Sequence, residues 1–179
     1  IAGVDEAGRG PWAGPVVAGA VILNNDGLPR RLLEGLDDSK KLSAQKRDEL
    51  FALLPNWAAI GVGLAEASEI DEINILRASF RAMERALAEL HPPPDYVLVD
   101  GNKLPSVPCA AEPVVKGDSR SLSIAAASIV AKVTRDRIMA GHADQFPAYG
   151  WERNAGYGTA EHKAALTRWG VTDQHRKSY

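Results

Sequence analysis

Two adjacent carboxylic acids, Asp5 and Glu6, open the chain directly after a short apolar run. Acids at the end of a buried strand are costly unless they stay hydrated, pair with cations or bind a metal. Gly8 and Gly10 flank Arg9 just downstream, a pattern that lets the backbone approach a ligand closely. The opening residues therefore indicate either a solvated acidic turn followed by a glycine loop, or part of a metal site.

Two further acids occupy comparable positions later in the chain. Asp100 ends the apolar, β-favouring run 96–99. Asp118 lies just before the alanine-rich stretch 123–137, which is predicted to be a helix. These are the partners that a metal site at the N-terminal acid pair would need.

The strands that must position these acids follow from the apolar pattern. Residues 1–4 are predicted to form a short buried strand, and residues 16–23 a second strand that pairs with it as an antiparallel hairpin. Apolar residues alternate over 58–64, as expected of a third strand. Together with the run at 96–99, this pattern predicts a mixed α/β domain.

Helices between these strands are predicted from capping residues and apolar spacing. Ser43 is expected to cap a short helix, and Ser68 with Asp71 resembles a capping box. Apolar side chains at three- and four-residue spacing over 73–90 predict an amphipathic helix that packs on the core. Thr159 is predicted to cap a helix near the end of the chain.

Composition is typical of one soluble domain with a substantial core. The chain has 179 residues, of which 45% are hydrophobic and 25% are charged. No apolar run approaches the roughly 18 residues that span a bilayer, so we expect a cytoplasmic protein without membrane contact. No extended apolar helix face is left unassigned, which favours a monomer.

Neither cysteine nor histidine is predicted to supply a metal site or a nucleophile in this sequence. Cys109 is the only cysteine, which excludes an intrachain disulfide and a thiolate zinc site. The four histidines are far apart and have no metal-ligand spacing. His162 is the histidine nearest to Tyr157, and no catalytic role is assigned to it.

Five longer motifs lie along the chain. They are DEAGRGPWAGPVVAGAVIL from Asp5, DSKKLS at 38–43, VDGN at 99–102, KGDSRSLSIAAASIVAKVTRDR at 116–137 and GYGTAEH at 156–162. Together they resemble ribonuclease HII, the type 2 ribonucleases H that nick RNA within RNA/DNA duplexes. The ending HRKSY is similar to the family too, whereas Ala155 stands where many members have lysine.

The resemblance implies a single catalytic domain over residues 1–179 with the ribonuclease H-like fold. That fold has a five-stranded mixed sheet flanked by helices, and the resemblance adds a helical C-terminal segment, about 141–179, that contacts substrate. Its first and fourth strands are adjacent, so Asp5 and Asp100 would emerge side by side, with Asp118 joining them from the start of a helix.

Four acids gathered in this way repel one another unless cations occupy the site. Oxygen ligands without histidine or cysteine favour Mg²⁺ or Mn²⁺ over zinc. Two such ions about 4 Å apart can activate water and stabilise the leaving oxygen of a phosphodiester. The predicted catalytic residues and metal ligands are therefore Asp5, Glu6, Asp100 and Asp118, with Asp5 bridging both ions.

The resemblance also assigns residues to substrate binding. Gly8, Arg9 and Gly10 match the family element that senses the ribose 2′-hydroxyl largely through backbone atoms, and Tyr157 matches the tyrosine that stacks on the neighbouring sugar. A tight glycine turn and a loop-anchoring tyrosine are the alternatives. Further candidates for phosphate or duplex contacts are Lys40, Lys41, Ser39, Arg120, Ser123, Ser128 and Lys132.

The implied activity is metal-dependent hydrolysis of RNA in RNA/DNA hybrids and nicking 5′ of ribonucleotides embedded in duplex DNA. The products would carry 5′-phosphate and 3′-hydroxyl ends, which suits removal of ribonucleotides in DNA repair and of primer RNA. The net charge of −2 argues against bulk electrostatic coating of nucleic acid, but residues 101–179 are mildly basic and could contact phosphates.

Two alternative functions remain from the residues alone. One is another nuclease of the same superfold, such as a junction resolvase or a type 1 ribonuclease H, which would not require a 2′-hydroxyl. The other is a nucleic-acid binding module whose acids do not react. A phosphate-loop NTPase is excluded because the chain has no GxxxxGK[ST] element.

Overall fold

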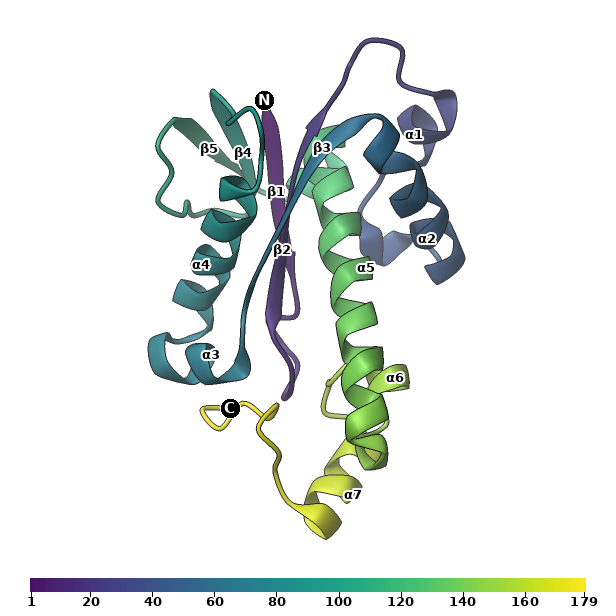
Figure 1. Ribbon diagram of the computed structural model, residues 1–179, viewed down its shortest axis with the longest axis vertical. Coiled ribbons are helices and arrows are strands. Elements are labelled where there is room, and N and C mark those ends of the chain that lie inside the picture. Colours follow the sequence, from purple (N-terminus) through teal and green to yellow (C-terminus); the bar gives the residue numbers. More distant parts are fainter.

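A five-stranded mixed sheet forms the centre of the computed structural model, which describes residues 1–179 (Figure 1). Its strand order is β3-β2-β1-β4-β5, with antiparallel pairing on the β2 side of β1 and parallel pairing from β1 through β4 to β5. The predicted hairpin and the predicted adjacency of the first and fourth strands are both confirmed. The strands are β1 (Ala2–Ala7), β2 (Val16–Leu23), β3 (Ala58–Ala65), β4 (Tyr96–Asp100) and β5 (Ala110–Val114).

Helices cover both faces of the sheet, with α4 on one side and α5 on the other (Figure 1). None of the helices is long and apolar enough to cross a membrane. The helices are α1 (Arg30–Gly35), α2 (Ala44–Leu53), α3 (Ala67–Ile73), α4 (Ile75–Ala88), α5 (Leu122–Gln145), α6 (Trp151–Asn154) and α7 (Ala160–Trp169), and the 3₁₀ turns are η1 (Ser39–Lys41), η2 (Leu54–Asn56), η3 (Gly117–Ser119) and η4 (Pro147–Tyr149).

Each face of the sheet has its own apolar core because side chains alternate along the strands. On β2, Ala18 and Ala20 pack in the cluster under α4, whereas Val21 belongs to the cluster under α5. The α4 helix approaches closely because β3 carries small residues. A Cβ atom at Gly63 would lie 2.1 Å from the carbonyl oxygen of Ala82, so only glycine permits this packing.

The predicted capping box at Ser68 and Asp71 is wrong, although Ser43 and Thr159 cap their helices as predicted. The α3 helix begins one residue before Ser68, and its N-cap Glu66 makes no side-chain capping bond. Asn74 then interrupts the predicted long helix with a φ of 74° and caps α4 through its side chain. Asparagine suits both tasks, since it tolerates left-handed backbone and accepts hydrogen bonds at helix starts.

Candidate active site

Three carboxylates converge where β1 and β4 lie side by side. Val4 pairs with Val99 in the parallel register, so Asp5 and Asp100 follow at the same level of the sheet. Asp118 joins them from η3, and carboxylate oxygens of the three acids all lie within 4.8 Å of one another. Strand pairing and a short turn therefore build the acid cluster that the sequence predicts.

Glu6, the fourth predicted acid, lies beside this cluster on the wall of the same cavity. One of its carboxylate oxygens, Oε2, is buried without any hydrogen-bond partner. The other, Oε1, lies 3.7 Å from the guanidinium of Arg9. A buried carboxylate oxygen without a donor is costly, so this atom is in the right state to bind a cation.

The electrostatics of the cluster disfavour negative charge. Burial raises the pKa of Asp5 well above its ordinary range, and repulsion from Glu6 and Asp100 raises it further. Burial followed by repulsion from Asp100 and Asp38 raises the pKa of Asp118 to about 6. Burial also raises the pKa of Glu6, although the Arg9 guanidinium opposes this effect. The residues thus fit a hard divalent cation, which would bind these oxygens and relieve their repulsion.

A cavity of about 370 Å³ surrounds the acids. It brings together the acid cluster, the glycine-flanked arginine and several predicted phosphate-binding residues, and its mixed charge suits an anionic ligand held by cations. The lining residues are Asp5, Glu6, Ala7, Gly8, Arg9, Gly10, Ser39, Lys40, Asp100, Asp118, Lys132, Arg135 and Tyr157.

Four of the predicted substrate-binding residues do not line this cavity. Lys41 is exposed and lies 4.0 Å from Asp37 as an ion pair. Ser128 is buried and accepts a hydrogen bond from the backbone of Ser39, so it supports the cavity wall from behind. The other two are Arg120, which is exposed, and Ser123, which is half-buried in the first turn of α5.

The backbone at Gly8 requires glycine for two reasons. Its φ is 94°, and a Cβ atom there would lie 2.1 Å from Nε of Arg135. Arg135 is 2% exposed and donates to the carbonyl oxygens of Ala13 and Pro15, each at 2.9 Å, and of Ala155 at 2.7 Å. Burial and the nearby charge of Arg176 lower the pKa of Arg135 to about 10. Arg135, which the sequence did not point to, thus fixes the glycine loop.

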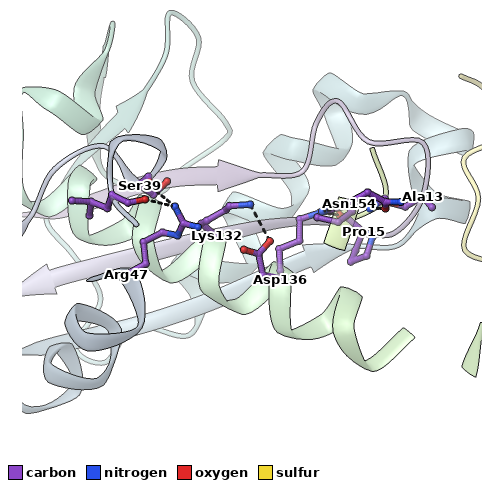
Figure 2. Close-up of polar contacts among 11 residues, drawn as sticks. Ala13, Pro15, Ser39, Arg47, Lys132, Asp136 and Asn154 are labelled. Atoms are coloured by element: carbon purple, nitrogen blue, oxygen red, sulfur yellow. Dashed lines mark hydrogen bonds and ion pairs between the residues drawn. The ribbon is translucent and has the colours of Figure 1, made fainter. Parts of the chain in front are cut away.

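A second arginine that no sequence pattern marks holds the turn that carries Lys40. Arg47 on α2 donates to the carbonyl oxygen of Ser39 at 2.8 Å (Figure 2) and to that of Leu42 at 2.7 Å. Asp38 caps the same turn by accepting from the backbone N–H of Lys40 at 3.0 Å. Helix and turn are therefore tied together directly beside the cavity.

Tyr157 presents its ring at the cavity, with 47% of the residue exposed, while buried His162 holds its backbone and buried His175 orients His162. The backbone N–H of Thr172 donates to Nδ1 of His175 at 2.9 Å, so neutral His175 carries its proton on Nε2. That N–H faces Nε2 of His162 at 2.9 Å, which leaves Nδ1 of His162 to donate to the Tyr157 carbonyl at 2.9 Å. His162 is therefore structural, and it is placed next to Tyr157.

Comparison with known proteins identifies relatives over the whole chain. A family model described as ribonuclease HII matches residues 2–179. The ribonuclease HII of Ruegeria pomeroyi is 58% identical over 180 residues, covering 100% of this chain and 75% of the relative. That of Rhodospirillum rubrum is 61% identical over 181 residues, covering 100% and 83% respectively.

Solved structures agree with this result. Ribonuclease H2 from Pyrococcus horikoshii OT3 superposes with a TM-score of 0.80 at 28% identity, covering 99% of this chain and 92% of the other. The structure of the PCNA:RNase HII complex from Archaeoglobus fulgidus gives a TM-score of 0.80 at 26% identity, covering 99% and 94%. Bst-RNase HIII in complex with Mn²⁺ shares the fold, with a TM-score of 0.74 at 16% identity and coverage of 99% and 66%.

Proposed function

The chain belongs to the ribonuclease HII family, which cleaves RNA in RNA/DNA hybrids, and we propose that it also nicks duplex DNA 5′ of embedded ribonucleotides. The observation that carries this proposal is the meeting of three elements in one cavity: the acid cluster, the Gly8–Gly10 loop and Tyr157. Acids alone would suit any nuclease of this fold. A backbone loop and an aromatic ring beside them add the means to recognise a sugar.

Divalent cations are part of the proposed reaction, with Mg²⁺ or Mn²⁺ held by Asp5, Glu6, Asp100 and Asp118. Two observations support this ligand set: the close approach of three carboxylates and the unpartnered buried oxygen of Glu6. When bound, such cations activate a water molecule and stabilise the leaving oxygen of the phosphodiester. The acids themselves hold the site in an all-oxygen arrangement that hard cations prefer.

Sugar recognition is assigned to Gly8, Arg9, Gly10 and Tyr157. A Cβ atom at Gly10 would lie 3.3 Å from the Tyr157 ring, so loop and ring are immediate neighbours. A 2′-hydroxyl both donates and accepts hydrogen bonds, which suits contact with backbone groups in a loop free of side-chain bulk. The ring then has room to stack on the adjacent sugar.

Phosphate contacts are assigned to Lys40, Lys132 and Ser39, which line the same cavity. The whole of residues 1–179 acts as one catalytic domain in this proposal. Its residues from 141 onward contribute Tyr157 to the substrate-binding surface. The biological role that follows is removal of misplaced ribonucleotides and of primer RNA.

The test is incubation of the protein with Mg²⁺ or Mn²⁺ and a DNA duplex containing one ribonucleotide. An all-DNA duplex and the Asp5→Asn variant are the controls. Metal-dependent nicking immediately 5′ of the ribonucleotide, absent from both controls, is expected. Cleavage of the all-DNA duplex would indicate a resolvase-like nuclease instead, and binding without cleavage would indicate an inert binding module.

A further inference from the structure

The end of the chain lies directly under the loop that carries the proposed sugar contacts. We define the C-terminal segment as residues 172–179 and the sugar loop as residues 8–15. The backbone N–H of Gly14 donates to Gln174 and that of Arg176 donates to Trp12, both at 2.8 Å, so the two segments pair like short antiparallel strands. Figure 1 shows this segment running from α7 back across the molecule to end beside α3.

Arg176 connects the C-terminal segment to the sugar loop through its buried guanidinium. The residue is 3% exposed, and burial lowers its pKa. No carboxylate forms an ion pair with it; backbone carbonyl dipoles satisfy its N–H groups instead. Its acceptors are the carbonyl oxygens of Gly8 at 2.5 Å, Arg9 at 3.0 Å, Pro11 at 2.8 Å, Gly14 at 3.0 Å and Pro15 at 3.2 Å.

Tyr179 extends the same contact. Its hydroxyl donates to the carbonyl oxygen of Arg9 at 2.6 Å, and its ring lies 5.2 Å from the guanidinium of Arg176. The peptide group between Arg9 and Gly10 is thus held by two donors from the C-terminal segment. The orientation of this peptide group, and so the direction of the Gly10 N–H, depends on the position of the C-terminal segment.

Asp71 on α3 fixes the position of the C-terminal segment from outside the cavity. Its carboxylate accepts from the backbone N–H groups of Lys177 at 3.0 Å and Ser178 at 2.9 Å, and from the Ser178 hydroxyl at 2.6 Å. Partial burial works to raise the pKa of Asp71, but the hydrogen bonds from Ser178 and Lys177 outweigh it and lower that pKa. These bonds hold the residues between Arg176 and Tyr179.

We propose that Asp71 is a positioning residue for recognition of the sugar, acting through residues 176–179 on the sugar loop. The inference rests on the proposed function, since it assigns Asp71 to the recognition step of that reaction. Backbone recognition of a hydroxyl depends on placement, and a displacement of about 1 Å costs about a hundredfold in rate when reacting groups are misaligned. Asp71 does not line the cavity and has no contact with the acid cluster.

The test compares Asp71→Ala with Glu72→Ala, an exposed neighbour on the same helix that makes no side-chain hydrogen bond. Cleavage of the duplex with one ribonucleotide gives kcat and KM, and the all-DNA duplex, added as a competitive inhibitor, gives a Ki that contains no 2′-hydroxyl contribution. Asp71→Ala is expected to lower kcat/KM about tenfold with the Ki unchanged within about twofold, whereas Glu72→Ala changes neither.

Two milder variants keep the test decisive if Asp71→Ala does not fold. Asp71→Asn retains one carbonyl oxygen and is expected to give an intermediate kcat/KM, and Ser178→Ala removes only the hydroxyl bond and should shift kcat/KM in the same direction. The inference would be contradicted if Asp71→Ala raised the Ki of the all-DNA duplex by the same factor by which it lowered kcat/KM. It would also be contradicted if the Asp71 variants behaved like Glu72→Ala. If the wild-type protein fails to nick 5′ of the ribonucleotide, the proposed function itself is wrong.

Discussion

The backbone N–H of Gly117 donates to the carboxylate of Asp100 across 2.8 Å, and this bond places Asp118 in the acid cluster. The N–H of Asp118 itself lies 3.4 Å from the same oxygen. One acid therefore orients the turn that supplies another, although 17 residues separate Asp100 from Gly117. The other carboxylate oxygen of Asp100, Oδ2, accepts neither of these bonds and is free to bind a cation.

Replacing Asp5 by asparagine should abolish cleavage while stabilising the cation-free protein. Activity is expected to fall by about three orders of magnitude, or about 4 kcal/mol of transition-state stabilisation, because a metal ligand is lost. The melting temperature without divalent cations should rise, since the variant removes a buried charge that Glu6 and Asp100 repel. Thermal melts with and without Mg²⁺ check both effects. If Mg²⁺ raised the melting temperature of Asp5→Asn as much as that of the wild-type protein, Asp5 would not be a metal ligand.

Gly8→Ala should be more damaging than Gly27→Ala, although both glycines have left-handed backbone, with φ of 94° and 80°. A Cβ atom at Gly8 meets Arg135, whereas one at Gly27 has no atom within 4 Å. We expect a loss of about 1 kcal/mol of unfolding free energy at Gly27 from strain alone, and about 2–4 kcal/mol with reduced cleavage at Gly8. Denaturant unfolding curves measure both. Equal losses of unfolding free energy at the two positions would show that contact with Arg135 does not explain the effect at Gly8.

Lys40→Ala and Lys41→Ala form a matched pair that separates cavity charge from surface charge. Lys40 lines the cavity, whereas Lys41 is paired with Asp37 on the surface. Lys40→Ala should weaken duplex binding about tenfold. It should also reduce the slope of the logarithm of the binding constant against the logarithm of salt concentration by the amount expected for about one phosphate contact. Binding titrations at several salt concentrations check this. If Lys41→Ala has the larger effect, the duplex follows a different path over the protein.

Arg47→Ala should raise KM for the duplex more than it lowers kcat. The change removes two hydrogen bonds that hold the turn bearing Lys40, and each bond is worth about 1 kcal/mol. We expect KM to rise about tenfold. Arg47→Lys keeps the charge but lacks the rigid guanidinium, so it should recover little of the loss. Full recovery by lysine would mean that charge alone matters at this position.

The histidine pair predicts a loss of stability in mild acid. Burial and the neighbouring His162 lower the pKa of His175 from 6.5 to about 4. Between those values the unfolded chain binds a proton that the native protein excludes, so stability is fully present above pH 6.5 and falls as the pH drops towards 4. Each pH unit in this interval corresponds to about 1.4 kcal/mol, so the expected loss by pH 5 is about 2 kcal/mol.

Melting curves between pH 7 and pH 4 test this prediction. His175→Asn retains an acceptor for the Thr172 N–H but does not titrate, so it should flatten the dependence on pH. His142→Asn, at the end of α5, is the control and should leave the slope as it is. An unchanged slope in His175→Asn would assign the acid sensitivity to other groups.

The parts of the fold and site that local patterns encode were predicted correctly. Alternation over 58–64 gave β3, and the apolar runs ending at Asp5 and Asp100 gave the two strands that carry these acids. The helix break at Asn74 was not predicted, because the apolar spacing continues through it and only the backbone shows the interruption.

The residues that hold the site in place could not be predicted from spacing. Arg135 and Arg176 donate to carbonyl groups, and a carbonyl acceptor is present at every residue, so no side-chain pattern marks the partner. Asp71 fits a capping pattern locally, yet its carboxylate binds residues that lie 106 and 107 positions away. In each case a long-range contact prevails over the local signal.

The bonds from Arg176 to the sugar loop also order events during synthesis. They join residues that are 161 to 168 positions apart, so the loop leaves the ribosome long before the guanidinium that organises it. Domains fold from the N-terminus as they emerge, and β1, β2 and the acids of the first strands can assemble early. We expect a ribosome-bound chain lacking residues 172–179 to bind nucleic acid without cutting it, so that cleavage begins only after Arg176 has reached the sugar loop.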